Sequence, residues 1–149
     1  MLKRLARLKR RVVARRARPA LAPVSAAHSA DIEELLHLAR LSFLRMQVAW
    51  DAGDLPTLAT LTTEPLLEDL RNQLLERGPA FNSTEVLSLD ARLLAIEELH
   101  EAYVASVEFS GVIREQRGEG AVPFREVWLL ANLKATSLGW QLARVQSLS

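Results

Sequence analysis

The chain has 149 residues, of which 49% are hydrophobic and 25% charged, and this is the composition of one globular domain large enough to bury a core. It contains no cysteine, which excludes disulfides and thiolate metal sites, and its three histidines are too widely spaced for a metal-binding motif, so we expect no metal and no cofactor. The formal net charge of +1 conceals a division, because residues 1–18 hold nine of the 19 Lys/Arg and no acid, which leaves ten Lys/Arg and all 18 Asp/Glu for the rest of the chain.

Residues 1–18 form the first predicted element, a basic amphipathic arm. Its apolar residues recur at helical spacing between Arg and Lys, as in a helix that lies in a membrane interface; they are Leu2, Leu5, Leu8 and Val12. Near an anionic leaflet each basic residue contributes roughly 1 kcal/mol. The candidate lipid-binding residues are therefore Lys3, Arg4, Arg7, Lys9, Arg10, Arg11, Arg15, Arg16 and Arg18. A mitochondrial targeting peptide, a nucleic-acid-binding tail and a solvated tail without a partner are the alternatives for this segment.

Residues 19–29, rich in Ala, Pro and Ser, form a predicted linker to a domain over residues 30–149. The longest purely apolar run in the chain, residues 127–131, is far shorter than the roughly 20 residues that a membrane-spanning helix needs. No apolar segment typical of a secretory signal follows the basic arm. We therefore expect any membrane contact to be peripheral.

Three helices are predicted at the start of the domain. Ser29 is the expected N-cap of a long helix, whose apolar residues keep helical spacing as far as Trp50 and which Gly53 ends. Two more helices follow, a short one around residues 56–61 and a longer one that Thr62 or Thr63 caps and Gly78 ends.

After Asn82 the apolar period changes to two, which predicts strands. The pattern is clearest from Tyr103 to Arg114, where apolar residues alternate with polar ones. Helices followed by consecutive antiparallel strands indicate the α+β class, with the N-terminal helices packed on one face of a four-stranded meander sheet; the family resemblance given below implies that this sheet is curved. The predicted strands are residues 85–96, 102–116, 123–136 and 140–148.

Several short motifs occur in one order along residues 31–146. These motifs are Met46–Leu55, Leu61–Leu66, Asn82–Val86, Val107–Glu115, Phe124–Trp128 and Gly139–Ala143. Together they resemble the Tim-forty-four-like domain family. This family includes the C-terminal domain of a peripheral subunit of the mitochondrial inner-membrane import motor, bacterial relatives and a protein of the mitochondrial large ribosomal subunit.

The resemblance implies a nuclear-transport-factor-2-like cone with an apolar pocket, and a role as a tether rather than a catalyst. We therefore expect a non-enzymatic peripheral membrane module that binds anionic lipid and a hydrophobic ligand or protein segment, in protein transport or membrane-protein assembly. Its expected location is the inner (cytoplasmic) membrane surface of a bacterium or the matrix side of the mitochondrial inner membrane, beside a protein partner that the sequence does not name. A ribosome- or RNA-associated relative is the alternative, with the arm as the nucleic-acid contact.

Most of the large aromatic residues are candidates for lining the pocket of such a cone. The predicted pocket residues are Phe43, Trp50, Phe109 and Trp128. Aromatic side chains bury much apolar area, so the alternative is that they fill the core.

Acid–base chemistry is the second alternative, because isomerases and dehydratases share the cone fold and use a carboxylate in an apolar pocket. Asp51 and Asp54 are candidates, although Asp54 also suits a helix cap. Glu108 lies on the polar face of its predicted strand, whereas Glu126 shares the parity of Trp128 and is expected to point inward. No nucleophile triad, phosphate loop or paired-carboxylate motif supports catalysis.

Overall fold

A computed structural model describes residues 26–78, 83–115 and 120–148 of the chain. The predicted arm over residues 1–18, with its nine candidate lipid-binding residues, lies outside the described residues. The described elements are three helices, α2 (Ala26–Ala52), α3 (Leu55–Leu61) and α4 (Glu64–Arg77), followed by four strands, β1 (Glu85–Glu98), β2 (Ala102–Arg114), β3 (Val122–Leu133) and β4 (Trp140–Ser147).

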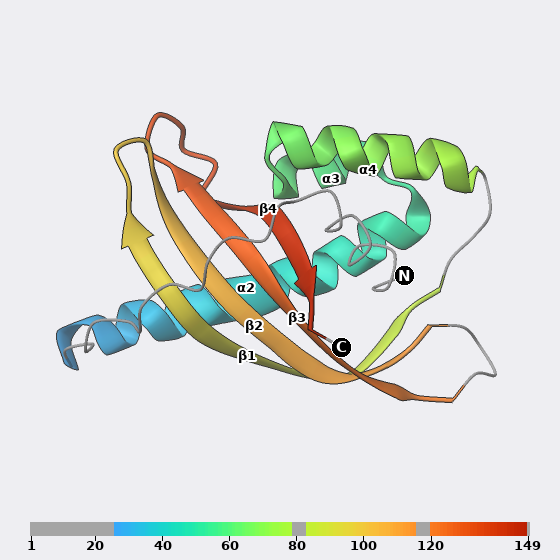
Figure 1. The fold of residues 1–149 in the computed structure, drawn as a ribbon, viewed down its shortest axis with the longest axis horizontal. Helices are drawn as coiled ribbons and strands as arrows, with labels where there is room; N and C mark the ends of the chain where they lie inside the picture. The colour runs from blue at the N-terminus through green and yellow to red at the C-terminus, as the bar shows by residue number, and fades with distance from the viewer. Residues whose placement is uncertain (1–25, 79–82, 116–119, 149) are drawn as a thin grey trace.

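The four strands form one antiparallel sheet in the order β1-β2-β3-β4, so each strand pairs with its neighbour in sequence. The sheet is twisted and curved, and α2 runs across it behind the strands in Figure 1, while α3 and α4 lie beside β4. This arrangement confirms the predicted α+β class, with N-terminal helices on a curved four-stranded antiparallel sheet.

The alternation in β2 explains which face of the sheet the helices cover. Ala102 at its start is buried, and the buried side chains that follow are Ala105, Val107, Phe109 and Ile113. The last three belong to the core cluster that also contains Phe43 of α2. The residues between them are only partly buried. An alternating strand buries one face and exposes the other, which accounts for the burial from Ala105 to Ile113. Tyr103 shares the parity of these residues but is 40% exposed.

One position of β2 needs glycine because β1 passes very close to it. A Cβ atom on Gly111 would lie 2.0 Å from the carbonyl oxygen of Ser88. The β1–β2 register shifts between Val86 and Ser88, directly beside this contact. A bulge of this kind bends a strand, so Gly111 permits the local bend of the sheet toward the helices.

The helix boundaries follow the predicted capping residues with one exception. Asp54 caps the start of α3. Gly78, which has a φ of 69°, ends α4, and its backbone N–H donates a hydrogen bond of 3.0 Å to the carbonyl of Leu74. The predicted cap Ser29 is wrong, because α2 already begins at Ala26. Alanine has the highest helix propensity, so the helix continues through Ala26 and Ala27 past the predicted boundary.

The core lies between α2 and the middle of the sheet. The ring of Phe43 on α2 packs against Phe109 at 4.8 Å, Trp128 at 5.0 Å and Phe124 at 5.6 Å between centroids. Phe109 and Trp128 meet edge to face at 5.1 Å. Aromatic clusters of this geometry stabilise a core beyond the area that they bury. In the part of the chain described, no helix is long and apolar enough to cross a membrane.

Candidate functional site

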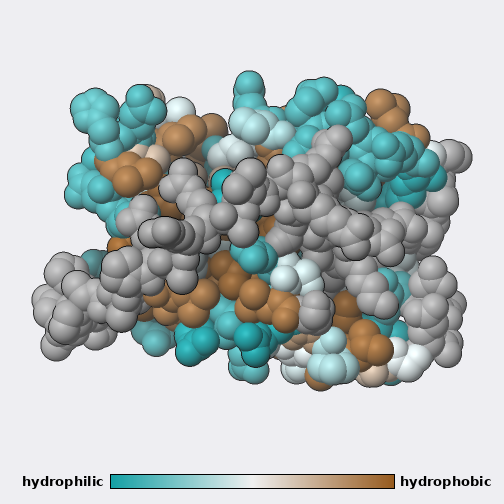
Figure 2. All heavy atoms as spheres, viewed as in Figure 1, coloured by the Kyte–Doolittle hydropathy of each residue, from teal (hydrophilic) through white to brown (hydrophobic). Residues whose placement is uncertain are grey.

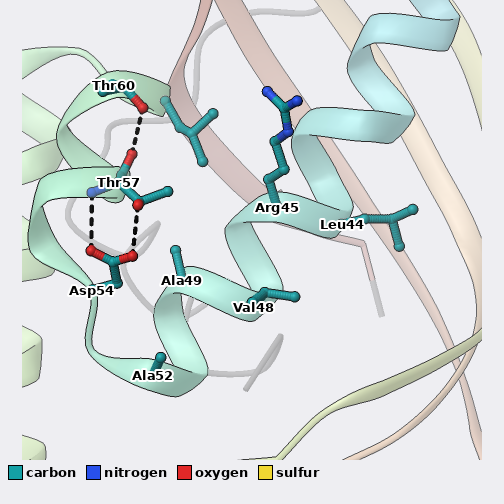
Figure 3. Close-up of a pocket in the computed structure, with 9 residues that line it drawn as sticks. Leu44, Arg45, Val48, Ala49, Ala52, Asp54, Thr57 and Thr60 are labelled. Atoms are coloured by element: carbon teal, nitrogen blue, oxygen red, sulfur yellow. Dashed lines mark hydrogen bonds between the residues drawn. The ribbon is translucent and has the colours of Figure 1, made fainter.

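A groove of about 480 Å³ lies between the C-terminal half of α2 and the short helix α3. Figure 3 shows it with α3 on one side and α2 on the other. Its walls are mainly apolar, and its lining residues are Leu44, Arg45, Val48, Ala49, Ala52, Asp54, Thr57, Thr60 and Leu61.

The α3 wall is held in place by the carboxylate of Asp54. One oxygen accepts a hydrogen bond from the backbone N–H of Thr57 at 3.2 Å, and the other accepts from the Thr57 hydroxyl at 2.6 Å (Figure 3). These two hydrogen bonds stabilise the charged form and lower the pKa of Asp54 below its ordinary value of 3.8. Asp54 therefore acts as the helix cap that the sequence predicted, and its carboxylate is already engaged.

The α2 wall of the groove is exposed and apolar. Leu44 is 42% exposed and Val48 is 71% exposed, although both lie on a helix whose other face fills the core. Two turns earlier the same helix exposes Leu38 and Leu41 to 42% and 39%. A run of apolar side chains on one exposed face marks a surface for a partner or ligand. These four residues are absent from the predicted site residues.

One cation stands on the rim of this apolar wall. Arg45 is exposed and lines the groove, and Figure 3 shows its side chain extending from α2 past the groove. Arg71, Arg92, Arg114 and Arg125 take part in ion pairs, whereas among the described residues no ion pair involves Arg45. The groove therefore offers apolar surface with a positive charge beside it, which suits an apolar segment that carries a negative charge.

The predicted pocket residues occupy the core. Phe43, Trp50, Phe109 and Trp128 each have 0% exposed surface, and none of them lines the groove. Phe43, Phe109 and Trp128 belong to the aromatic cluster. Trp50 lies under the guanidinium of Arg77, 5.5 Å from the centre of its ring. Their positions match the alternative reading of these residues as core.

The candidate acid–base residues do not gather in one place along the fold. Glu126 points inward as its parity predicted, is 2% exposed, and accepts a hydrogen bond from the Trp128 indole at 2.8 Å. Glu108 lies on the opposite face of the sheet, between Arg92 at 3.0 Å and Arg125 at 3.4 Å. These contacts hold both carboxylates as structural partners.

Asp51, the remaining candidate, fastens the end of α2 to the start of the sheet. Its carboxylate accepts from the Thr84 backbone N–H at 2.8 Å and from the Thr84 hydroxyl at 3.2 Å. Desolvation raises the pKa of Asp51 and is only partly opposed by these hydrogen bonds. In the described ranges no three His, Asp or Glu residues are placed to hold a metal ion.

Two buried polar groups on α2 lack hydrogen-bond partners in the described structure. Gln47 is 2% exposed, and neither its amide oxygen nor its amide nitrogen is bonded. The indole nitrogen of Trp50, one turn along the same helix, is also unbonded. Buried polar groups are almost always paired, so these two are exceptions that need a physical cause. Sequence reasoning missed Gln47 because one amide in an apolar stripe gives no periodic signal.

The surface of the described domain is mixed rather than apolar throughout. Figure 2 shows hydrophilic side chains over the exposed side of α4, and hydrophobic and hydrophilic side chains side by side over the strands. The α2 face that flanks the groove is identified instead by the exposed fractions of Leu38, Leu41, Leu44 and Val48.

No family model matches the chain, and no curated protein matches it. A nuclear transport factor 2 (NTF2-like) superfamily protein from Salmonella enterica serovar Typhimurium is 12% identical over 80% of this chain and 91% of its own, with a TM-score of 0.45. A ketosteroid isomerase-like protein from Erwinia carotovora atroseptica is 15% identical, covering 78% and 98%, with a TM-score of 0.43. A conserved protein from Planctomyces limnophilus is 16% identical, covering 78% and 94%, with a TM-score of 0.42. These similarities are distant, and the arrangement of helices on a four-stranded antiparallel sheet is shown by the structure of the chain itself.

Proposed function

We propose that the chain is a non-catalytic binding module that the basic arm, residues 1–18, holds at an anionic membrane surface. The observation that carries the proposal is the division of charge. The arm has nine Lys/Arg and no acid, whereas the rest of the chain has ten Lys/Arg and 18 Asp/Glu, a net charge of −8. An anionic surface attracts the arm and repels the acidic domain, so the arm makes the lipid contact and the domain faces away from the lipid.

The domain's own binding surface in this proposal is the groove between α2 and α3. Support comes from the exposed Leu44 and Val48, which form an apolar wall, and from Arg45 beside them. A helical protein segment that places apolar side chains at helical spacing suits such a groove. The resemblance to the Tim-forty-four-like family suggests protein transport or membrane-protein assembly as the process, at a bacterial inner membrane or the matrix side of the mitochondrial one.

Co-sedimentation with lipid vesicles tests the membrane part. The intact chain and a deletion of residues 1–18 are compared on cardiolipin-containing and on neutral vesicles, at low and high salt. The proposal predicts that only the intact chain binds, only to anionic vesicles, and less at high salt because exposed charges are screened.

A matched control separates charge from amphipathicity in the arm. Replacement of Leu2, Leu5 and Leu8 by alanine keeps all nine basic residues, so it should weaken vesicle binding without abolishing its salt dependence. The same proteins are tested on structured RNA, which is the competing anionic partner for the arm. Binding to RNA without binding to vesicles would replace the membrane proposal with the nucleic-acid alternative.

A further inference from the structure

We infer that the groove and the adjoining exposed face of α2 bind the α2 helix of a second copy of this chain, in an antiparallel pair. This inference rests on the proposed function only in one respect, since it names the helical segment that occupies the groove. Three features of α2 support it: the spacing of its exposed residues, the symmetry of their charges, and their continuity with the groove.

The spacing places one line of residues along the exposed face of α2. Glu34, Leu38, Leu41, Arg45 and Val48 follow one another at intervals of four, three, four and three residues. Intervals that alternate in this way keep side chains on the seam that one helix presents to another. All five are exposed, and Leu38, Leu41 and Val48 remain 42%, 39% and 71% exposed. The line is therefore an apolar seam without a partner in the described structure.

The charges on this line are symmetric about its centre. The midpoint between Glu34 and Arg45 falls between Ala39 and Arg40, and the midpoint between Leu38 and Leu41 falls at the same place. When two such helices pack antiparallel about that point, Leu38 faces Leu41 of the other copy and Glu34 faces Arg45. A two-fold interface requires this self-complementarity, in which each contact occurs twice.

The two charged residues are available for this contact. Among the described residues neither Glu34 nor Arg45 takes part in an ion pair, whereas five other pairs of opposite charge are formed. In a symmetric pair each would gain a partner at the edge of an apolar seam. Such charges fix register and orientation more than they add affinity, so they favour the antiparallel arrangement over the parallel one.

The groove continues the seam at the end of α2. Arg45 and Val48 belong both to the seam and to the groove lining, which extends along α2 through Ala49 to Ala52. In an antiparallel pair centred between Ala39 and Arg40, the residues of the second copy that precede Glu34 would lie beside the C-terminal part of α2 in the first copy, next to α3. The first turns of α2 project beyond the edge of the sheet in Figure 1, so this part of the helix extends away from the domain that carries it.

The basic arm is a poorer occupant for the same surface. The arm has nine positive charges and no negative one, and the seam itself carries the positive charge of Arg45. Like charges across a contact are unfavourable, whereas the start of α2 offers Asp31, Glu33 and Glu34 near Arg45 of the other copy. A contact made by one helix from each copy is expected to bury less than the roughly 1,600 Å² of a standard protein interface. We therefore expect a weak dimer whose population rises with protein concentration.

A charge-exchange series on the full chain tests the inference. Self-association of the wild type, Glu34→Arg, Arg45→Glu and the double variant is measured by sedimentation velocity over a range of concentrations. Each single variant places like charges together twice and should weaken dimerisation by about tenfold or more, while the double variant restores both pairs and should recover most of the loss. Leu75→Glu, at a 74% exposed leucine on α4, is the matched control and should leave dimerisation unchanged.

Introduced cysteines report the orientation, because the chain has none of its own. A mixture of Glu34→Cys and Arg45→Cys chains should form a disulfide-linked heterodimer under mild oxidation. Two Glu34→Cys chains should not cross-link, because in the antiparallel pair the two positions lie about 17 Å apart along the helix axis. Preferential Glu34→Cys homodimers would contradict the antiparallel arrangement.

Three further results would overturn the inference. They are a wild type that stays monomeric at every concentration, single variants that associate as the wild type does, and a double variant no stronger than the singles. Dimerisation that appears only after deletion of residues 1–18 would also overturn it, because the arm would then be the occupant. Vesicle binding of the wild type is measured in parallel, so a failure of the dimer is distinguished from a failure of the membrane proposal.

Discussion

The indole N–H of Trp128 donates a hydrogen bond of 2.8 Å to the carboxylate of Glu126, two residues earlier on the same face of β3. Trp128 is fully buried and Glu126 is 2% exposed, so the contact lies inside the aromatic core. A carboxylate in such a place needs donors, because an unsatisfied buried charge is costly. The tryptophan therefore serves two roles, as a packed core residue and as a donor to the acid.

This contact predicts that Trp128→Phe lowers stability through more than the loss of volume. Removing the donor leaves a buried acceptor short of one hydrogen bond, which costs roughly 1–3 kcal/mol in addition to the cavity. Chemical denaturation of the single variants and of the double variant with Glu126→Leu, which removes the acceptor, measures the coupling between the two residues. Additive losses in the double variant would mean that the hydrogen bond contributes nothing to stability.

Gly111→Ala is predicted to strain the contact between β1 and β2. The added Cβ would lie 2.0 Å from the backbone oxygen of Ser88, which can move only with its strand. Overpacking of this kind costs roughly 1–3 kcal/mol, and more when the obstacle is backbone. Gly120→Ala is the matched control, because no atom lies within 4 Å of the Cβ position there. Equal stability of the two variants in thermal unfolding would contradict the close approach.

Gln47→Leu is predicted to stabilise the protein. The buried amide makes no hydrogen bond in the described structure, and removing an unsatisfied polar group recovers a desolvation cost of roughly 1–3 kcal/mol. Gln141→Leu is the matched comparison, because the Gln141 amide donates to the carbonyls of Thr62 at 3.3 Å and Thr60 at 3.4 Å. That variant should be less stable than the wild type. A loss of stability in Gln47→Leu would show that a water or polar ligand satisfies the amide.

The cap of α3 predicts a pH dependence with a definite sign. Hydrogen bonds from Thr57 lower the pKa of Asp54 from 3.8, so the folded state favours the charged carboxylate more than the unfolded state does. The resulting stability is present above about pH 3.8 and is lost as the pH falls through the lowered pKa. The stability difference between the wild type and Asp54→Ala should therefore shrink in acid. If the stability difference between the wild type and Asp54→Ala stayed constant between about pH 7 and about pH 2, the capping role would be contradicted.

Much of the fold follows from the sequence pattern. β1, β2 and β4 begin at the predicted residues 85, 102 and 140, because alternation of apolar residues and the turns between them mark strands clearly. The inward direction of Glu126 follows from parity alone. The bend at Gly111 does not, because it depends on which atom of β1 lies opposite, and the register shift there has no sequence signal.

The candidate site was less predictable than the fold. The helical spacing of apolar residues places Phe43 and Trp50 on one face of α2. Their complete burial depends on how closely the sheet packs against that face. Leu38 and Leu41 lie on α2 outside the stripe that faces the core. The spacing of apolar residues along a helix does not show whether another part of the protein buries such side chains. Only the positions of α3 and the sheet reveal that Leu38 and Leu41 are exposed.

The most direct test of the central proposal is co-sedimentation with cardiolipin-containing and neutral vesicles, for the intact chain and for the chain without residues 1–18, at low and high salt. The membrane proposal predicts salt-sensitive binding of the intact chain to the anionic vesicles and no binding after the deletion, because the arm holds nine basic residues and the remainder is acidic. Absence of binding by the intact chain, or equal binding by the deletion, would contradict it.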